Sequence, residues 1–458
     1  HLREDEGLGE PGVQVLVEEL AVVLGEALCV DVHNPFKVAY REGPEGKSLI
    51  AHVIPLILLP LKFKEIALIL GKFKRIRNKL VMMADKTQES RVMDPVYIKA
   101  VHGHFEIVKA YWERTTPSFI VKTRGKGYRQ HLMKPAFKAL ADELRGHGYL
   151  PRIRWIIDNY HISILERKVG GEESYLRNQI LFAATVLTVM FDGYLRSNNP
   201  VLTQELMTGV PVIVNAMVFT VALLVIFGVH EYGHRYMAIK RGMDTSQPYF
   251  IPAPPGMGGT LGAVLSQREP PVNRDALYDL GLSGPISGFV MTALVGIVGI
   301  SLSYVVSNAQ ATRWMIEYPS IRFQILPMPP LLDLIASVIR PTMEGQVLIM
   351  HPVAFAAWVG CVVTFINLIP SWQLDGGHII RAFLGRESHK IISAAGVILL
   401  VVSGYMFMGL VVAFFMMKSG AESIEPLDDI SPISPSRRLG LIIYVLVMLL
   451  SLVALLPI

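Results

Sequence analysis

The sequence is poor in cysteine and in charged residues. Two cysteines in 458 residues, Cys29 and Cys361, are too few for a disulfide framework or for a zinc module built on cysteine. Charged residues make up 18% and hydrophobic residues 52%, whereas soluble domains have roughly 25% charged residues. This composition excludes intrinsic disorder and a collagen-like repeat as descriptions of the whole chain. The formal net charge of +5 is small for this length and does not indicate nucleic-acid binding.

Long apolar runs fill the second part of the chain. A helix that spans a bilayer needs about 20 mostly apolar residues, and six runs meet or approach this length: Ile180–Leu195, Gly209–Gly228, Leu280–Val306, Pro352–Ile369, Ile391–Met417 and Leu439–Ile458. So many runs of this length are rare in soluble folds. They predict a polytopic α-helical membrane protein with about six transmembrane helices; several buried helices of one large soluble core are the alternative.

The first part of the chain mixes charge and hydrophobicity, as soluble proteins do. Residues 1–95 stay unassigned; within them, Leu49–Leu61 is short, carries internal prolines and precedes a basic stretch, so a buried or membrane-surface helix is favoured over a span. Residues 96–177 are expected to form a soluble α/β domain, and residues 178–458 the membrane-embedded domain. The elements expected in the α/β domain are a strand at Ser118–Thr123, a helix at Gln130–Gly146, and strands at Arg152–Ile157 and His161–Glu166.

The segment Tyr249–Gln267 is apolar but rich in proline and glycine, which argues against a helix. Non-helical backbone of this kind suits a re-entrant segment packed within protein at membrane depth. A simple external loop is the alternative.

The second apolar run ends in the motif His230-Glu231-Tyr232-Gly233-His234. Residues four apart share one face of a helix, so His230 and His234 can offer two imidazole nitrogens to one zinc ion. Glu231 can then serve as general base toward a water molecule at the metal. The alternative is a helix end whose polar residues are merely solvated.

A catalytic zinc has three protein ligands, and the third is not close to the motif in the chain. The positions two helical turns downstream hold Met237 and Lys240. Asp375, just beyond the fourth apolar run, is the best candidate. If the second run ends on one face of the membrane, the third crosses away and the fourth returns, so Asp375 lies on the same face as the two histidines.

Three motifs together resemble the site-2 protease family of intramembrane zinc metalloproteases: HEYGH, GGTLGAV with Gly284-Pro285 downstream, and NLIPSWQLDGGH. The resemblance covers about Asn178–Gly385, and the preceding α/β segment looks like the prefix domain of archaeal and chloroplast-type members. It implies that His230, His234 and Asp375 hold one zinc ion per chain. It also implies Glu231 as the catalytic acid/base and Asn367 as a polar residue beside the site.

The resemblance further implies a zinc metalloendopeptidase that hydrolyses a peptide bond within or near a transmembrane segment of a membrane-protein substrate, in regulated intramembrane proteolysis. We expect a transmembrane substrate and the lipid bilayer as partners, no nucleic acid, and leave the oligomeric state open. The loop Arg235–Asp279 holds five Lys/Arg, against none at 197–208 and three at 308–350. This charge bias predicts that both termini, and so the N-terminal domain, are cytosolic. The protein is expected to be a multi-pass membrane protein in the plasma membrane of a prokaryote.

Gly259 and Gly262 are expected to support substrate binding, because glycine permits close approach of another backbone and an extended edge can accept an unwound substrate as an added strand. Asn367 either donates a hydrogen bond to the substrate oxyanion or caps a helix break at Pro370. His378 either orients a metal ligand or begins a solvated helix. A non-catalytic scaffold and a metal transporter are the rival functions; intact Glu231 argues against the first, and the scarcity of intramembrane acids beyond Asp192 against the second.

Overall fold

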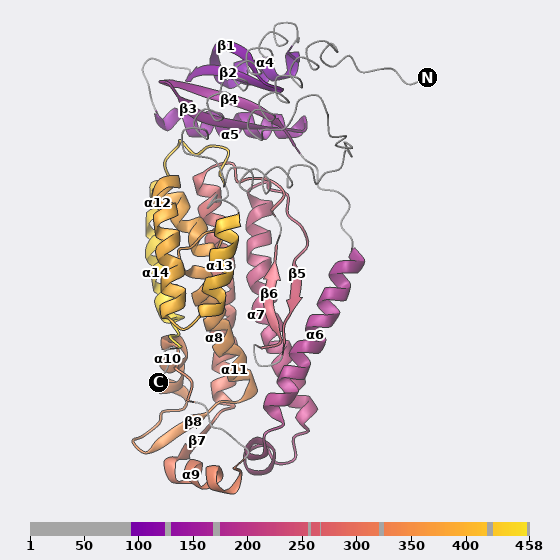
Figure 1. Cartoon of the computed structure of the whole chain (residues 1–458), viewed down its shortest axis with the longest axis vertical. Coiled ribbons are helices and arrows are strands. Elements are labelled where there is room, and N and C mark those ends of the chain that lie inside the picture. Colours follow the sequence, from indigo (N-terminus) through magenta and orange to yellow (C-terminus); the bar gives the residue numbers. More distant parts are fainter. Residues whose placement is uncertain are drawn as a thin grey trace, which may run out of the picture. The chain divides into compact units, whose positions relative to one another are not determined.

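A computed structural model of the chain (Figure 1) describes residues 93–123, 130–167, 175–254, 258–265, 267–319, 325–418 and 425–455. The predicted unassigned segment 1–95 lies outside these residues except for its last three, and so does the predicted surface helix Leu49–Leu61. The boundaries of the three predicted domains stay predictions.

The first described unit is a four-stranded antiparallel sheet with two helices. It consists of α4 (Pro95–His104), β1 (Phe105–Glu113), β2 (Thr116–Thr123), α5 (Gln130–Gly146), β3 (Tyr149–Ile156) and β4 (Asn159–Glu166). The strand order is β1-β2-β4-β3. The amphipathic helix α5 packs its apolar face on the sheet, and the buried core includes Phe105, Phe119, Phe137, Leu140 and Ile162. The elements expected from the sequence are confirmed here; α4 and β1 are additional.

Three helices are long and apolar enough to cross a membrane: α6 (Tyr175–Ser197), α7 (Val212–Lys240) and α8 (Arg274–Ser301). They contain or overlap the first three predicted runs. A short π-helix, η1 (Val201–Leu206), connects α6 to α7. The acidic residue of α6, Asp192, is buried and accepts a hydrogen bond of 2.6 Å from Nε of Arg196, one turn further on. This pairing compensates the charge within the apolar helix.

Helix α8 is the central element of the membrane domain, since α7, α11 (Pro352–Leu368) and α12 (Asp375–Val402) all pack against it. Small residues allow the backbones to approach closely: a Cβ at Gly299 would lie 2.5 Å from Cα of Ala354 in α11. Helix α11 follows the fourth predicted run, and its 17 residues cover about 26 Å.

The prediction of one span over Ile391–Met417 is wrong. Helix α12 ends at Val402, and α13 (Met406–Lys418) turns back and packs against it. Gly404 lies between them with φ of +91°, while the N–H of Tyr405 donates to Leu400 and that of Gly404 to Val401. This is the Schellman arrangement that ends helices, and the uninterrupted apolar sequence conceals it.

Helix α12 also breaks internally. Gly385 has φ of 80° and ψ of −173°, which no helix contains. The hydroxyl of Ser371 donates to the carbonyl of Ser393, and the N–H of Trp372 donates to the hydroxyl of Ser393. The second arm of α12 therefore runs back beside the loop that precedes the first arm.

The prediction of a full span at Leu439–Ile458 is also wrong in length. Helix α14 (Arg438–Leu450) has 13 residues and covers about 20 Å, less than the roughly 30 Å of a hydrocarbon core. Residues 452–455 are not helical. Three helices of spanning length are present in the described part of the chain, so the predicted number of about six is not confirmed.

The proline- and glycine-rich segment after α7 forms a two-stranded antiparallel hairpin, β5 (Tyr249–Pro252) and β6 (Thr260–Val264). Figure 1 shows it beside α6 and α7. Phe250 contacts Phe182 of α6 with ring centroids 5.2 Å apart, and the hydroxyl of Thr188 in α6 donates to the carbonyl of Gly259 at 2.7 Å. The segment is thus non-helical and packed against protein; its depth in the membrane stays a prediction.

A second two-stranded sheet, β7 (Tyr304–Ser307) with β8 (Gln346–Ile349), follows α8, and the helices α9 (Asn308–Glu317) and α10 (Pro330–Ile339) lie between its strands in the chain. The short helix η2 (Pro435–Arg437) precedes α14.

The segment before η2 joins the α/β domain to the membrane helices. Its residue Asp428 makes one parallel bridge to Ile153 of β3 and another to Asn273 before α8. Next to it, Asp429 accepts two hydrogen bonds from the buried Arg381 of α12 and one from Arg274. These contacts fix the edge of the sheet to the helices that form the site described next.

Candidate metal centre

Three side chains from two helices converge on one point. Nε2 of His230 lies 3.2 Å from Nε2 of His234, and Oδ2 of Asp375 lies 3.4 Å and 3.3 Å from these two nitrogens. All three residues are buried or nearly so, and they are the group found among the described residues that could hold a metal ion. A tetrahedral zinc with bonds of about 2.0–2.1 Å has ligand atoms about 3.3 Å apart. The three donor atoms therefore form a triangle of the size that zinc requires.

The surroundings of the histidines set the orientation of their rings. Nδ1 of His234 lies 2.9 Å from the carbonyl of Leu280 in α8 and donates to it when it carries the proton, which leaves Nε2 free to bind a metal. Two glycines of α8 make the necessary space. A Cβ at Gly284 would come within 2.5 Å of Cε1 of His234, and one at Gly288 within 2.8 Å of Nδ1 of His230.

The carboxylate of Asp375 comes from the first residue of α12. The loop before it is held by hydrogen bonds of its own, from the N–H of Leu374 to Ser371 and from the N–H of Ser371 to Ile369. The next position in the helix, Gly376, is close to the end of α11, where a Cβ would lie 2.5 Å from the carbonyl carbon of Leu368. The backbone packing of α12 on α11 thus brings the aspartate to the histidines.

A cavity of about 700 Å³ opens at this centre. Glu231 lines it together with the three metal-site residues, and Asn367, His378 and the end of strand β6 line it as well. Glu231 is 9% exposed. A buried carboxylate beside two imidazoles and a cavity is the arrangement that a general base requires.

The remaining predicted residues differ in their relation to the cavity. Nδ2 of Asn367 lies 3.4 Å from Nε2 of His230, at the C-terminal end of α11. His378 is buried, and its Nδ1 has no hydrogen-bond partner. Gly259 lies against α6, where a Cβ would be 2.5 Å from the carbonyl oxygen of Thr188, and a Cβ at Gly262 would meet nothing within 4 Å. Neither glycine lines the cavity, whereas the neighbouring Ala263 and Val264 do.

Sequence reasoning missed an aromatic pair at the cavity. Trp372 has φ of +42°, a rare value for this residue type, and its ring stacks on Phe415 of α13 at 5.7 Å with an angle of 8° between the planes. Both side chains line the cavity. The position of Trp372 three residues before Asp375 was a usable signal, but nothing in the sequence places Phe415 at the site.

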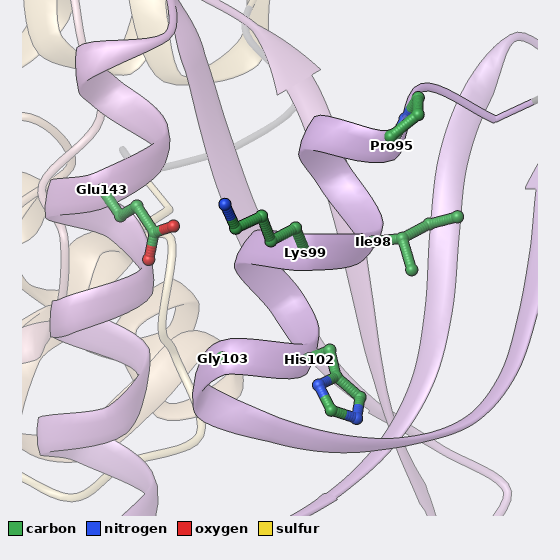
Figure 2. Close-up of a pocket in the computed structure, with 6 residues that line it drawn as sticks. All are labelled: Pro95, Ile98, Lys99, His102, Gly103 and Glu143. Carbon is green, nitrogen blue, oxygen red and sulfur yellow. The ribbon is translucent and has the colours of Figure 1, made fainter.

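A second cavity, in the α/β domain, offers no comparable chemistry. Figure 2 shows this groove of about 580 Å³ between α4 and α5, with Lys99 and Glu143 on its two sides and His102 at one end. Nearby, His104 pairs with Glu143 at 2.8 Å, and no residue of this groove belongs to a group that could hold a metal ion in the described part of the chain.

Comparison with known proteins finds similarity to zinc metalloproteases. A sequence profile of peptidase family M50 matches residues 218–411, which include all three donor residues, Glu231 and Asn367. A rice protein (Oryza sativa subsp. indica), "Probable zinc metalloprotease EGY2, chloroplastic", is 29% identical over 44% of this chain and 36% of its own length. The Arabidopsis thaliana proteins "Probable zinc metallopeptidase EGY3, chloroplastic" and "Probable zinc metalloprotease EGY2, chloroplastic" are 28% and 25% identical, over 47% and 59% of this chain and 38% and 47% of their own lengths.

The chain spans less than half the length of these relatives, and no solved structure matches it. Because their names place them in chloroplasts, the comparisons give no support to the predicted prokaryotic plasma membrane. The apolar helices agree with a membrane protein, and the donor triangle agrees with the zinc of the family. The match over residues 218–411 shows that this part of the chain is similar to peptidase family M50, and the zinc metalloproteases among the relatives agree with the site-2 protease resemblance of the motifs.

Proposed function

We propose that this chain is a zinc-dependent endopeptidase that hydrolyses a peptide bond within or near a transmembrane segment of another membrane protein. The observation that carries the proposal is the convergence of His230, His234 and Asp375 with Glu231 on one cavity at the end of the apolar helix α7. Zinc, when bound, acts as a Lewis acid toward a carbonyl group and lowers the pKa of water to about 7.

The protein side chains supply the proton transfers and the charge stabilisation. Glu231 takes a proton from the attacking water and returns it to the leaving amine. The amide of Asn367 donates a hydrogen bond to the oxygen of the scissile carbonyl as negative charge develops there, which its position 3.4 Å from a metal-ligand nitrogen allows. Removing one such donor costs about 10²–10³-fold in rate.

The substrate is expected to bind in extended form. An intact helix engages its carbonyl groups in i→i−4 hydrogen bonds, so the segment must unwind before attack. Strand β6 pairs with β5 on one side only among the described strands, and its end lines the cavity. An unwound segment can add to the other side of β6 as a further strand. Ala263 and Val264, rather than Gly259 and Gly262, then lie nearest to the scissile bond.

The proposal also includes the arrangement in the membrane. We infer that α6, α7 and α8 cross the membrane, with the α/β domain on the side that the excess of Lys and Arg marks as the inner one. A lipid bilayer and a transmembrane substrate are the proposed partners, and regulated intramembrane proteolysis is the proposed context. Ion transport is disfavoured because the acidic residue of α6, Asp192, is engaged by Arg196.

The test compares Glu231→Gln with wild-type protein and with Glu344→Gln, an exposed carboxylate before β8. Zinc per chain and cleavage of a labelled single-span peptide with a glycine-proline break are measured in the same preparation. Loss of a general base costs roughly 10²–10⁴-fold, so Glu231→Gln should keep its zinc and lose cleavage, while Glu344→Gln keeps both. Near-native cleavage by Glu231→Gln would exclude its catalytic role, and full zinc without cleavage by the wild type would favour the scaffold.

A further inference from the structure

The hairpin between β3 and β4 exposes an apolar tip. Trp155, Ile156 and Ile157 are 44%, 41% and 88% exposed. Ile157 and Asp158 form the turn, with φ of 45° and 58°. Asparagine and glycine are the residues suited to two successive left-handed positions, whereas β-branched isoleucine is strained there. The chain thus carries a strained and exposed apolar residue at a position where a small polar one would fold more easily.

Trp155 lies on the face of the sheet that α5 covers, and α5 in turn contacts helix α8. Trp155 packs edge-on against Tyr160 at 4.7 Å, and Tyr160 belongs to the core that α5 covers. On the other side of α5, Lys134 pairs at 2.6 Å with Asp275, the second residue of α8. The sheet face that carries Trp155 is therefore the one covered by α5, which contacts the start of α8.

Charged contacts connect this hairpin to the surface of α12. Arg154 and Arg152 of β3 lie 3.2 Å and 3.7 Å from Glu425, and Arg386 of α12 lies 3.8 Å from the same carboxylate. With Asp158, the five side chains sum to a charge of +1. Leu384 and Ile391 of α12, on either side of the polar segment 385–390 that contains Arg386, are 51% and 75% exposed. One ion-pair cluster thus lies between the apolar tip of the hairpin and the exposed apolar side chains of α12.

We propose that the tip Trp155–Ile157 inserts into the interfacial layer of the bilayer in which the membrane domain lies, with the arginines of the cluster at the level of the lipid phosphates. Tryptophan is enriched at membrane interfaces, and arginine binds phosphate groups well. Burial of Ile157 in lipid explains why an isoleucine is present despite the strain of its backbone. The hairpin then anchors the α/β domain to the bilayer in addition to its contacts with the helices.

The test uses the full chain reconstituted in phosphatidylcholine bilayers. A fluorophore is attached to Ile157→Cys in a Cys29→Ser background, where the remaining Cys361 is buried. The control carries the label at Thr115→Cys, in the exposed turn between β1 and β2 at the opposite end of the strands. Phosphatidylcholine brominated near the top of its acyl chains should quench the label at position 157 and leave the label at position 115 unchanged. Equal fluorescence at 157 with and without bromine would overturn the proposal.

A second variant separates membrane contact from a structural role. Asparagine adopts left-handed conformations readily, so Ile157→Asn should raise the Tm measured in detergent. With the label moved to position 156 by Ile156→Cys, the same substitution should lower the quenching by brominated lipid. A lower Tm together with unchanged quenching would show that Ile157 serves the fold. Fluorescence at 157 that changes with protein concentration and not with lipid would assign the tip to a second protein copy, which also refutes insertion.

Discussion

Gly284→Ala tests whether the fold is shaped around the metal site. Gly284 lies on α8 opposite His234, and an added Cβ would come within 2.5 Å of Cε1 of that imidazole. Ordinary contact begins at 3.4 Å, so Cε1 must move by about 0.9 Å and Nε2, which lies still closer to the added Cβ, must move further. Zinc sites tolerate distance errors of about 0.2 Å. The substitution should therefore displace one ligand far beyond what a bound zinc ion accepts.

The expected loss concerns zinc and not folding. Alanine is favoured over glycine in a helix by about 1 kcal/mol, which opposes the local crowding. Changes in the residues that orient a ligand reduce metal affinity by roughly 10–100-fold, and displacement of the ligand itself should reach at least the upper end of that range. Gly288→Ala should have a weaker effect, because its Cβ would lie 2.8 Å from Nδ1 of His230.

The assay is competition with a zinc chelator of known affinity, followed by metal analysis of the purified chain. The matched control is Gly228→Ala, two residues before His230, because a Cβ there would meet nothing within 4 Å. Unchanged zinc affinity and cleavage in Gly284→Ala would show that His234 is not held as described. Equal losses of zinc affinity in Gly228→Ala and Gly284→Ala would show that the effect comes from replacing a helix glycine and not from crowding of His234.

Three further outcomes are expected. Asp375→Ala should lose zinc and activity together in metal analysis and cleavage assays; full zinc in this variant would place the third ligand elsewhere, with His378 the next candidate. Gly404→Ala should lower the free energy of unfolding by about 1–3 kcal/mol, because Gly404 has φ of +91° and a Cβ would lie 2.7 Å from the carbonyl carbon of Leu455. An unchanged midpoint of chemical unfolding would contradict the described turn between α12 and α13. Burial raises the pKa of Asp428 above its usual 3.8. The protonated carboxyl therefore contributes to the stability of the folded state fully below pH 3.8, and this contribution is lost as the pH rises through the raised pKa. Asp428→Asn should flatten this pH dependence of Tm, and a variant with the same Tm-against-pH profile as the wild type would refute the pKa shift.

The elements that the sequence predicted well are those whose signal is local. The α/β strands alternate, the helix α5 has regular apolar spacing, and α6, α7 and α8 are continuous apolar runs. The pair His230 and His234 is also a local signal, because a spacing of four residues places both side chains on one face of a helix. The number of apolar runs between Asp375 and the histidines predicted that these residues lie on the same face of the membrane. Two later runs were predicted as full spans, and the structure shows shorter helices there.

The features that could not be predicted depend on contacts between distant segments. The turn at Gly404 lies inside an apolar stretch, and its Schellman hydrogen bonds become visible only when α13 is seen to pack back on α12. The break at Gly385 has the same character. Gly288 and Phe415 carry no motif; the first matters because α8 crosses behind His230, and the second because α13 returns to the cavity.

The metal centre is thereby coupled to the packing of four helices. Helix α7 supplies two of the candidate donor atoms and α12 the third. Helix α8 supplies the space for the rings and the carbonyl of Leu280, and α11 supplies the amide of Asn367. A zinc ion binds only the assembled arrangement, and any ligand that binds only the folded state stabilises it by mass action. Substitutions at the tight α11–α12 contact of Gly376 should therefore weaken zinc binding although Gly376 touches no metal ligand through a side chain, because they move the backbone that carries Asp375. The site is thus a property of helix packing as much as of its motifs, which is why the motifs pointed to the three candidate donor residues but not to the residues that hold them in place.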